Sequence, residues 1–123
     1  MYELKVTTHF SAAHRLAMVG EKCENLHGHN WKVEAYVSGK DLNEAGVLMD
    51  FGVVKKHVRE LMGTLDHKYL NELPHLFDTG IPSSELIAKY IADALQEKID
   101  TPGIRVSKVS AWESETSCAT YIP

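Results

Sequence analysis

The chain has 123 residues, a hydrophobic fraction of 44% and a formal net charge of −4 at pH 7. These values are typical of a globular protein, and we expect one domain over residues 1–123. No apolar run approaches the roughly 20 residues that span a bilayer, and no basic stripe offsets the negative charge. We therefore expect neither a membrane nor a nucleic acid as partner.

Cysteine content and the first residues both bear on the cellular compartment. The chain has only two cysteines, Cys23 and Cys118, which are too few for a disulfide scaffold. Residues 1–6 lack the basic and apolar regions of a signal peptide. We expect a cytoplasmic protein, in which Cys118 is a small buried side chain within strand-like sequence.

Alternation of apolar and polar residues predicts the strands. The first runs from about Leu4 toward Phe10, and a clearer one begins at Trp31 and is ended by Gly39. A short strand is expected at residues 47–49. Residues 104–112 and 118–122 are expected to close the chain as a β-hairpin.

Two helices are predicted between these strands. Apolar residues at helical spacing indicate a helix over about residues 52–65, with Asp50 as its N-cap. Ser83 or Ser84 can cap the second helix, and Glu85 lies in its first turn. This order predicts an α+β fold, an antiparallel β-sheet with two helices on one face. The uncovered face and edges of such a sheet favour assembly into an oligomer.

The histidine pattern carries most of the chemical information. His27 and His29 are two residues apart, so both imidazoles leave the same face of an extended segment. A third histidine from a neighbouring strand, with His14 as the candidate, would complete a three-nitrogen site with an open fourth position, as in catalytic zinc sites. A rival set is Cys23 with His27 and His29 as a structural site. Zinc suits nitrogen ligands best, although copper or iron could bind the same imidazoles.

Five motifs in order resemble the 6-pyruvoyltetrahydropterin synthase family, specifically its bacterial 6-carboxytetrahydropterin synthase branch. They cover nearly the whole chain: Phe-Ser-Ala-Ala-His-Arg-Leu at 10–16, Cys-x-x-x-His-Gly-His-Asn at 23–30, Leu-Asp-His-x-x-Leu-Asn at 65–71, Pro-Ser-Ser-Glu at 82–85 and Trp-Glu-Ser-x-Thr at 112–116. The three-residue gap between Cys23 and His27 is the feature that resembles the carboxy branch.

The resemblance implies a fold and an activity. The fold is the tunnelling fold, in which subunit sheets join into a barrel and two rings stack into a homohexamer with active sites at subunit interfaces. The implied reaction converts 7,8-dihydroneopterin triphosphate to 6-carboxy-5,6,7,8-tetrahydropterin and releases acetaldehyde and triphosphate. It is an early step toward queuosine and related deazapurines.

The resemblance also implies roles for individual residues. Its zinc ligands correspond to His14, His27 and His29, with one Zn²⁺ per subunit. Its catalytic base corresponds to Cys23, which is also a possible zinc ligand in the resting enzyme. Its proton-relay pair and its pterin-anchoring carboxylate correspond to three further residues: Asp66, His67 and Glu113.

Several readings remain open beside this one. Glu115 rivals Glu113 as the ring anchor, because it lies two positions on and is expected to face the same side. Glu24 beside Cys23 keeps open the folate-type cleavage of dihydroneopterin side chains. Formation of 6-pyruvoyltetrahydropterin is a further alternative. A non-enzymatic zinc-binding or pterin-binding oligomer on the same fold is another.

Overall fold

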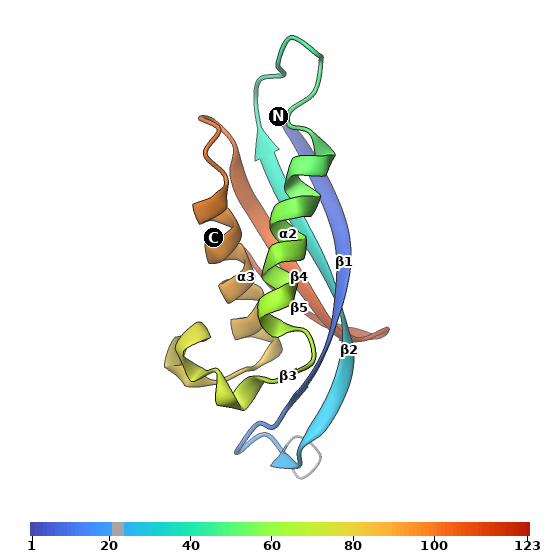
Figure 1. Ribbon diagram of the computed structural model, residues 1–123, viewed down its shortest axis with the longest axis vertical. Coiled ribbons are helices and arrows are strands. Elements are labelled where there is room, and N and C mark those ends of the chain that lie inside the picture. The colour runs from blue at the N-terminus through green and yellow to red at the C-terminus, as the bar shows by residue number, and fades with distance from the viewer. Residues whose placement is uncertain (21–23) are drawn as a thin grey trace.

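The computed structural model describes residues 1–20 and 24–123, and its centre is a β-sheet with two helices on one face (Figure 1). In the described residues the sheet has the strand order β3-β1-β2-β4-β5. Its strands are β1 (Tyr2–His14), β2 (His27–Gly39), β3 (Lys68–Tyr69), β4 (Arg105–Ser114) and β5 (Ser117–Tyr121). All neighbours are antiparallel except the short parallel pair of β1 and β3. The predicted α+β fold is confirmed, with one parallel contact that the pattern did not indicate.

The two predicted helices are confirmed together with their caps. Helix α2 spans Phe51–Leu65, and the Asp50 carboxylate accepts a hydrogen bond of 2.7 Å from the Gly52 N–H. Helix α3 spans Ser84–Lys98, and the Ser83 hydroxyl accepts one of 3.2 Å from the Leu86 N–H. Such caps satisfy N–H groups that the first turn leaves without a partner.

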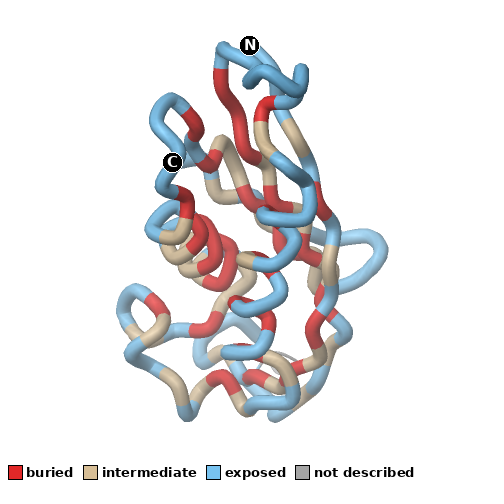
Figure 2. The backbone as a smooth tube through the Cα atoms, turned by 45° about the horizontal axis from the view of Figure 1, so that its top comes forward, coloured by how far each residue is buried: buried red, intermediate tan, exposed pale blue. Residues whose placement is uncertain are grey.

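The core lies between the sheet and these helices, as the buried residues along the strands and the inner helix faces show (Figure 2). Alternate residues of β1 and β2 face it, and Trp31 is completely buried with its ring stacked on Phe10 at 5.7 Å between centroids. Three short 3₁₀ turns, η1 (Leu70–Glu72), η2 (Pro74–Leu76) and η3 (Asp78–Gly80), connect β3 to α3. This connection passes the end of the sheet at which β1 ends and β2 begins.

Two local expectations are wrong. Residues 47–49 are irregular, with bends at 48 and 49, rather than a strand. Leu48 is buried and Met49 packs against the core, whereas Val47 is exposed, and none of the described strands pairs with this segment. Cys118 is exposed, because it lies on the edge strand β5 and pairs with Trp112 on the face of the sheet away from α2 and α3.

No described helix combines the length and apolar character required to cross a bilayer.

Two glycine substitutions test how tightly the fold is packed. Gly63 lies in α2 with nothing within 4 Å of an added Cβ, so Gly63→Ala is expected to raise the free energy of unfolding by about 0.5–1 kcal/mol. Gly39 ends β2 where a Cβ would lie 2.9 Å from the Gly103 carbonyl oxygen, so Gly39→Ala is expected to lower it by about 1–3 kcal/mol. Urea denaturation of both variants measures these changes. Equal stability of the two variants would contradict this account of the Gly39 contact.

Candidate metal centre

The register of β1 against β2 brings the three predicted histidine ligands together. His14 pairs directly with His27, and Ala12 pairs with His29. Residues that alternate along a strand share one face, so all three imidazoles lie on the helix-covered face. The ring centroids are 4.6 Å apart for His14 and His27, 4.7 Å for His27 and His29, and 5.3 Å for His14 and His29.

A carboxylate from β4 joins these imidazoles. Glu113 follows the buried Ala111 by two residues, which places both side chains on the same face of the strand. Glu113 Oε1 lies 3.1 Å from His14 Nε2 and 3.0 Å from His29 Nε2. One ligand atom from each of the four residues lies within 4.8 Å of every other, so the group could hold a metal ion.

Backbone carbonyl groups orient two of the rings. Nδ1 of the fully buried His14 lies 2.8 Å from the Pro82 carbonyl oxygen, and His27 Nδ1 lies 2.7 Å from that of Asn25. A carbonyl only accepts, so each Nδ1 carries the proton and donates it. In the neutral rings the lone pair is then on Nε2, which is the arrangement that hydrogen-bonding carbonyls impose on metal-bound histidines.

The third ring is held by packing rather than by a carbonyl. Trp31 meets the edges of His14 and His29, with centroids 5.2 and 5.4 Å apart. Burial lowers the pKa of His29, which favours its neutral form. His29 Nε2 is buried and has no hydrogen-bond partner among the described residues, because the nearby Glu113 oxygen does not have hydrogen-bond geometry.

The nitrogen and oxygen donors of this group suit a borderline-soft metal cation. A buried nitrogen without a hydrogen-bond partner is costly, and a cation bound at Nε2 would satisfy it. Three imidazole nitrogens with one carboxylate oxygen are a donor set typical of zinc. The three histidines would hold the ion, with the Glu113 carboxylate beside it.

Asp66 and His67 form the pair that we predicted, at the helix end that such a pairing requires. Asp66 is the C-cap of α2, and His67 has a φ of 57°, which turns its ring back so that Nδ1 lies 2.9 Å from Asp66 Oδ2. The Ser11 N–H donates a hydrogen bond of 2.8 Å to Asp66 Oδ1. This bond is the main reason why the pKa of Asp66 is lowered, and the hydrogen bond from His67 lowers it further. The carboxylate is therefore ionised and able to stabilise an imidazolium at His67.

This pair lies outside the group of possible metal ligands. His67 is 82% exposed, whereas His14 is fully buried. His67 nevertheless lines an open hollow of about 510 Å³ together with residues 11–13 of β1 and 28–30 of β2, at the strand ends that carry the histidines. Within one subunit the pair is thus a neighbour of the metal centre.

The two candidate ring anchors lie in different places. Glu113 borders a hollow of about 450 Å³ together with Ser84, Glu85 and residues 117–120 of β5. Glu115 lies in the turn after β4 and lines another hollow with His9 and Lys32. The expectation that both face the same side is wrong, because β4 ends at Ser114 and the alternation ends with it.

The predicted base Cys23 lies outside the described residues, so its role stays a prediction. Its neighbour Glu24 is described, and its carboxylate accepts a hydrogen bond of 3.1 Å from the Met18 N–H. This bond ties Glu24 to the loop between β1 and β2.

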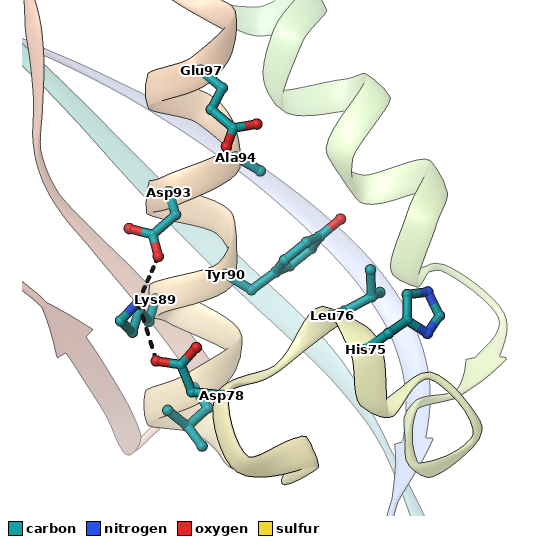
Figure 3. A pocket seen from close by; sticks show the side chains of 9 residues that line it. His75, Leu76, Asp78, Lys89, Tyr90, Asp93, Ala94 and Glu97 are labelled. Atoms are coloured by element: carbon teal, nitrogen blue, oxygen red, sulfur yellow. Dashed lines mark hydrogen bonds and ion pairs between the residues drawn. The ribbon is translucent and has the colours of Figure 1, made fainter.

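A separate pocket of about 200 Å³ lies between α3 and the 3₁₀ turns and contains no predicted site residue (Figure 3). The Lys89 ammonium contacts Asp93 at 2.6 Å and Asp78 at 3.2 Å across its mouth. Both hydrogen bonds raise the pKa of Lys89, and the one to Asp93 has the larger effect. The ammonium of this pocket is therefore already engaged by two carboxylates, which leaves the histidine group as the stronger candidate.

Sequence reasoning missed the groups that position His14. Its Nδ1 partner is a backbone carbonyl, which leaves no mark in the residue pattern. The Asn71 side chain accepts from the Arg15 N–H and donates to the Arg15 carbonyl, both at 2.9 Å. This clamp acts on the residue next to His14 and continues the pairing of β3 with β1. Asn71 belongs to the motif at 65–71, which was the available signal.

Comparisons with known proteins agree with the resemblance seen in the motifs. A family profile described as 6-pyruvoyl tetrahydropterin synthase matches residues 3–123. A protein of Synechocystis named 6-carboxy-5,6,7,8-tetrahydropterin synthase is 39% identical over 91% of this chain and 86% of its own length. One of Bacillus subtilis with the same name is 33% identical over 99% and 86%. The structure of Caenorhabditis elegans 6-pyruvoyl tetrahydropterin synthase superposes with a TM-score of 0.85 at 27% identity, over 99% of this chain and 95% of that one.

The Asn71 clamp generates a prediction about metal affinity. Asn71→Ala removes both hydrogen bonds to Arg15 and frees the end of β1, so His14 loses part of its fixed orientation. We expect the affinity for Zn²⁺ to fall by up to about tenfold in a chelator competition assay, since one such bond contributes about 1 kcal/mol. Glu72→Ala, at an exposed residue of the same turn, is the control and is expected to bind as the wild type does. Equal affinities in the two variants would show that the clamp does not position His14.

Proposed function

The chain belongs to the 6-pyruvoyl tetrahydropterin synthase family, and we propose that it is a zinc-dependent 6-carboxytetrahydropterin synthase. It would convert 7,8-dihydroneopterin triphosphate to 6-carboxy-5,6,7,8-tetrahydropterin, with release of acetaldehyde and triphosphate, on the path to queuosine. The convergence of the His14, His27 and His29 rings on one centre carries the proposal. The names of the relatives described above support this choice within the family.

The three imidazoles are the groups that would hold the zinc ion. In such a site zinc supplies Lewis acidity toward the hydroxyl and carbonyl oxygens of the substrate side chain. The protein fixes the rings beforehand through the Pro82 and Asn25 carbonyls and through Trp31. This preorganisation lowers the conformational cost of binding.

The pterin ring is assigned to the hollow beside Glu113. Its volume of about 450 Å³ lies in the range of small-molecule sites, about 300–1,000 Å³. A carboxylate can accept two parallel hydrogen bonds from the amino-pyrimidinone edge of a pterin. The Glu113 side chain is 30% exposed, so it can be reached from the hollow.

Proton transfer is assigned to Cys23, Asp66 and His67. A thiol near zinc and an imidazolium has a lowered pKa, which would make Cys23 a base at neutral pH. The ionised Asp66 orients the His67 ring through the 2.9 Å contact and stabilises its charged form, so His67 can donate and accept a proton. Both assignments come from the family resemblance, and the Asp66–His67 contact supports the second.

We propose a cytoplasmic homohexamer with interfacial active sites. In the described residues, β1 pairs with β3 only at residues 12–13, and Ser11 is bonded to Asp66 and His67, so residues 2–10 present a free edge, and the outer edge of β5 is also free. Exposed strand edges of this length are prone to pair with another chain. The high exposure of His67 fits a position where a neighbouring subunit completes its surroundings.

The activity can be tested by identifying the products. Purified protein incubated with 7,8-dihydroneopterin triphosphate is expected to yield acetaldehyde, triphosphate and the carboxypterin by mass spectrometry. A chelator is expected to abolish turnover, and added Zn²⁺ to restore it. A hydroxymethylpterin would favour the folate-type reaction, and a pyruvoyl product the pyruvoyl synthase reaction. Metal and pterin binding without turnover would identify a non-enzymatic oligomer.

The assignment of His67 predicts a loss of turnover without loss of metal. We expect His67→Ala to lower kcat by about 10²–10⁴, the usual contribution of general acid–base catalysis, with zinc content unchanged. His75→Ala is the matched control, because His75 lines the separate pocket beside α3, and its activity is expected to equal the wild-type value. Unchanged turnover of His67→Ala with full zinc content would exclude His67 from the mechanism.

A further inference from the structure

The Glu113 carboxylate lies where it could serve either the metal centre or the pterin ring. Its Oε1 lies 3.1 Å from His14 Nε2 and 3.0 Å from His29 Nε2, among the possible metal ligands. The same side chain borders the hollow assigned to the pterin ring. We propose that Glu113 is a displaceable fourth ligand, which closes the metal centre in the resting enzyme and moves to the pterin ring when substrate binds. This inference rests on the function proposed above.

The spacing of the atoms supports the resting arrangement. Tetrahedral zinc with bonds of about 2.0–2.1 Å to nitrogen and oxygen separates its ligand atoms by about 3.3 Å. The two distances from Glu113 Oε1, 3.1 and 3.0 Å, are close to that edge length. The widest separation in the group is below 4.8 Å, so the remaining atoms need only small shifts to surround an ion.

The positions of the histidine protons also support Glu113 as a ligand in the resting enzyme. Nδ1 of His14 donates to the Pro82 carbonyl, so in the neutral ring its Nε2 directs a lone pair at the Glu113 oxygen. His29 Nε2 faces the same oxygen without hydrogen-bond geometry. Two acceptors at 3.1 Å repel each other unless a cation or a proton lies between them. A divalent ion at the common centre satisfies all of these atoms together.

The position of Glu113 on β4 makes the exchange possible. It is the second-last residue of the strand, next to the hairpin turn, and its side chain is 30% exposed, whereas His14 is fully buried. A rotation of this one side chain can therefore turn the carboxylate between the metal and the hollow. A carboxylate that accepts two parallel hydrogen bonds from a ring edge cannot at the same time occupy the ligand position. Ring binding would thus open a position on the metal for the side-chain oxygens of the substrate.

The exchange has a thermodynamic consequence that can be measured. An unsubstituted pterin has the ring edge but no side chain to replace the lost ligand. Its binding should therefore weaken metal binding, and metal should weaken its binding by the same factor, because coupling between two sites is reciprocal. A carboxylate that served only as a ring anchor would produce no such antagonism.

The test uses Co²⁺-loaded full-length protein, whose visible absorption depends on the number and kind of its ligands. In the wild type, saturating unsubstituted pterin is expected to change the Co²⁺ spectrum and to lower Co²⁺ affinity in chelator competition. Without pterin, Glu113→Gln is expected to bind Co²⁺ at least about tenfold more weakly and with an altered spectrum. Glu113→Ala is the second variant, and Glu115→Gln is the control that should retain wild-type values because Glu115 lines a different hollow.

Each contrary outcome has a distinct meaning. Wild-type Co²⁺ affinity and spectrum in both Glu113 variants would overturn the inference while leaving the proposed function in place. Weaker Co²⁺ binding in the variants, with a wild-type spectrum that ignores saturating pterin, would make Glu113 a permanent ligand and would also overturn the exchange. Failure of the wild type to bind Co²⁺ or Zn²⁺ at all would instead refute the proposed function.

Discussion

The antiparallel pairing of β1 with β2 is the constraint on which the candidate site depends. His14 lies directly opposite His27, and His29 lies opposite Ala12 on the same face. A shift of this register by one residue would turn one set of side chains to the other face and separate the rings. The register is fixed by the core as well, because the same pairing buries Phe10 against Trp31 and Val6 beside Ala35. Hydrophobic packing along the two strands thus aligns the polar groups at their end.

The position of Glu113 adds a second constraint from β4. Its register against β2 places Ala111 opposite Val33, both fully buried, and Glu113 is the next side chain on that face toward the histidines. At that point the core gives way to the metal centre, where Trp31 forms the boundary between the two. The same aromatic ring therefore completes the apolar core and supports two imidazoles.

Much of this arrangement could be predicted from the sequence, because it follows from local periodicity. The spacing of His27 and His29 gives their common face, and the caps at Asp50 and Ser83 give the helix starts. The turn that Asp66 and His67 need was also foreseeable from their adjacency. The placement of Glu113 beside His14 could not be predicted, since these residues are 99 positions apart in the chain and meet only through the register of three strands.

Errors arose where tertiary context overrides local pattern. Residues 47–49 have strand-like composition but no neighbouring strand, so they cover the core as a loop. Cys118 has strand neighbours but lies on an edge, where its face receives no cover from a helix. Glu115 does not face the same side as Glu113, because the hairpin turn begins between the two residues. The carbonyls of Pro82 and Asn25 are invisible to any residue pattern, although they set the protonated nitrogen of two rings.

The bond from His14 to the Pro82 carbonyl has a consequence for the lifetime of the protein in a cell. Pro82 directly precedes the Ser83 cap of α3, so an ion at the histidines would fasten β1, β2, β4 and the start of α3 to one point. An ion that binds only the folded chain adds about 2.7 kcal/mol to its stability at one hundred times the dissociation constant. Chains without the ion would lack this added stability, would open more often and would be degraded sooner. The cell's zinc supply would thus control the abundance of the protein as well as its chemistry.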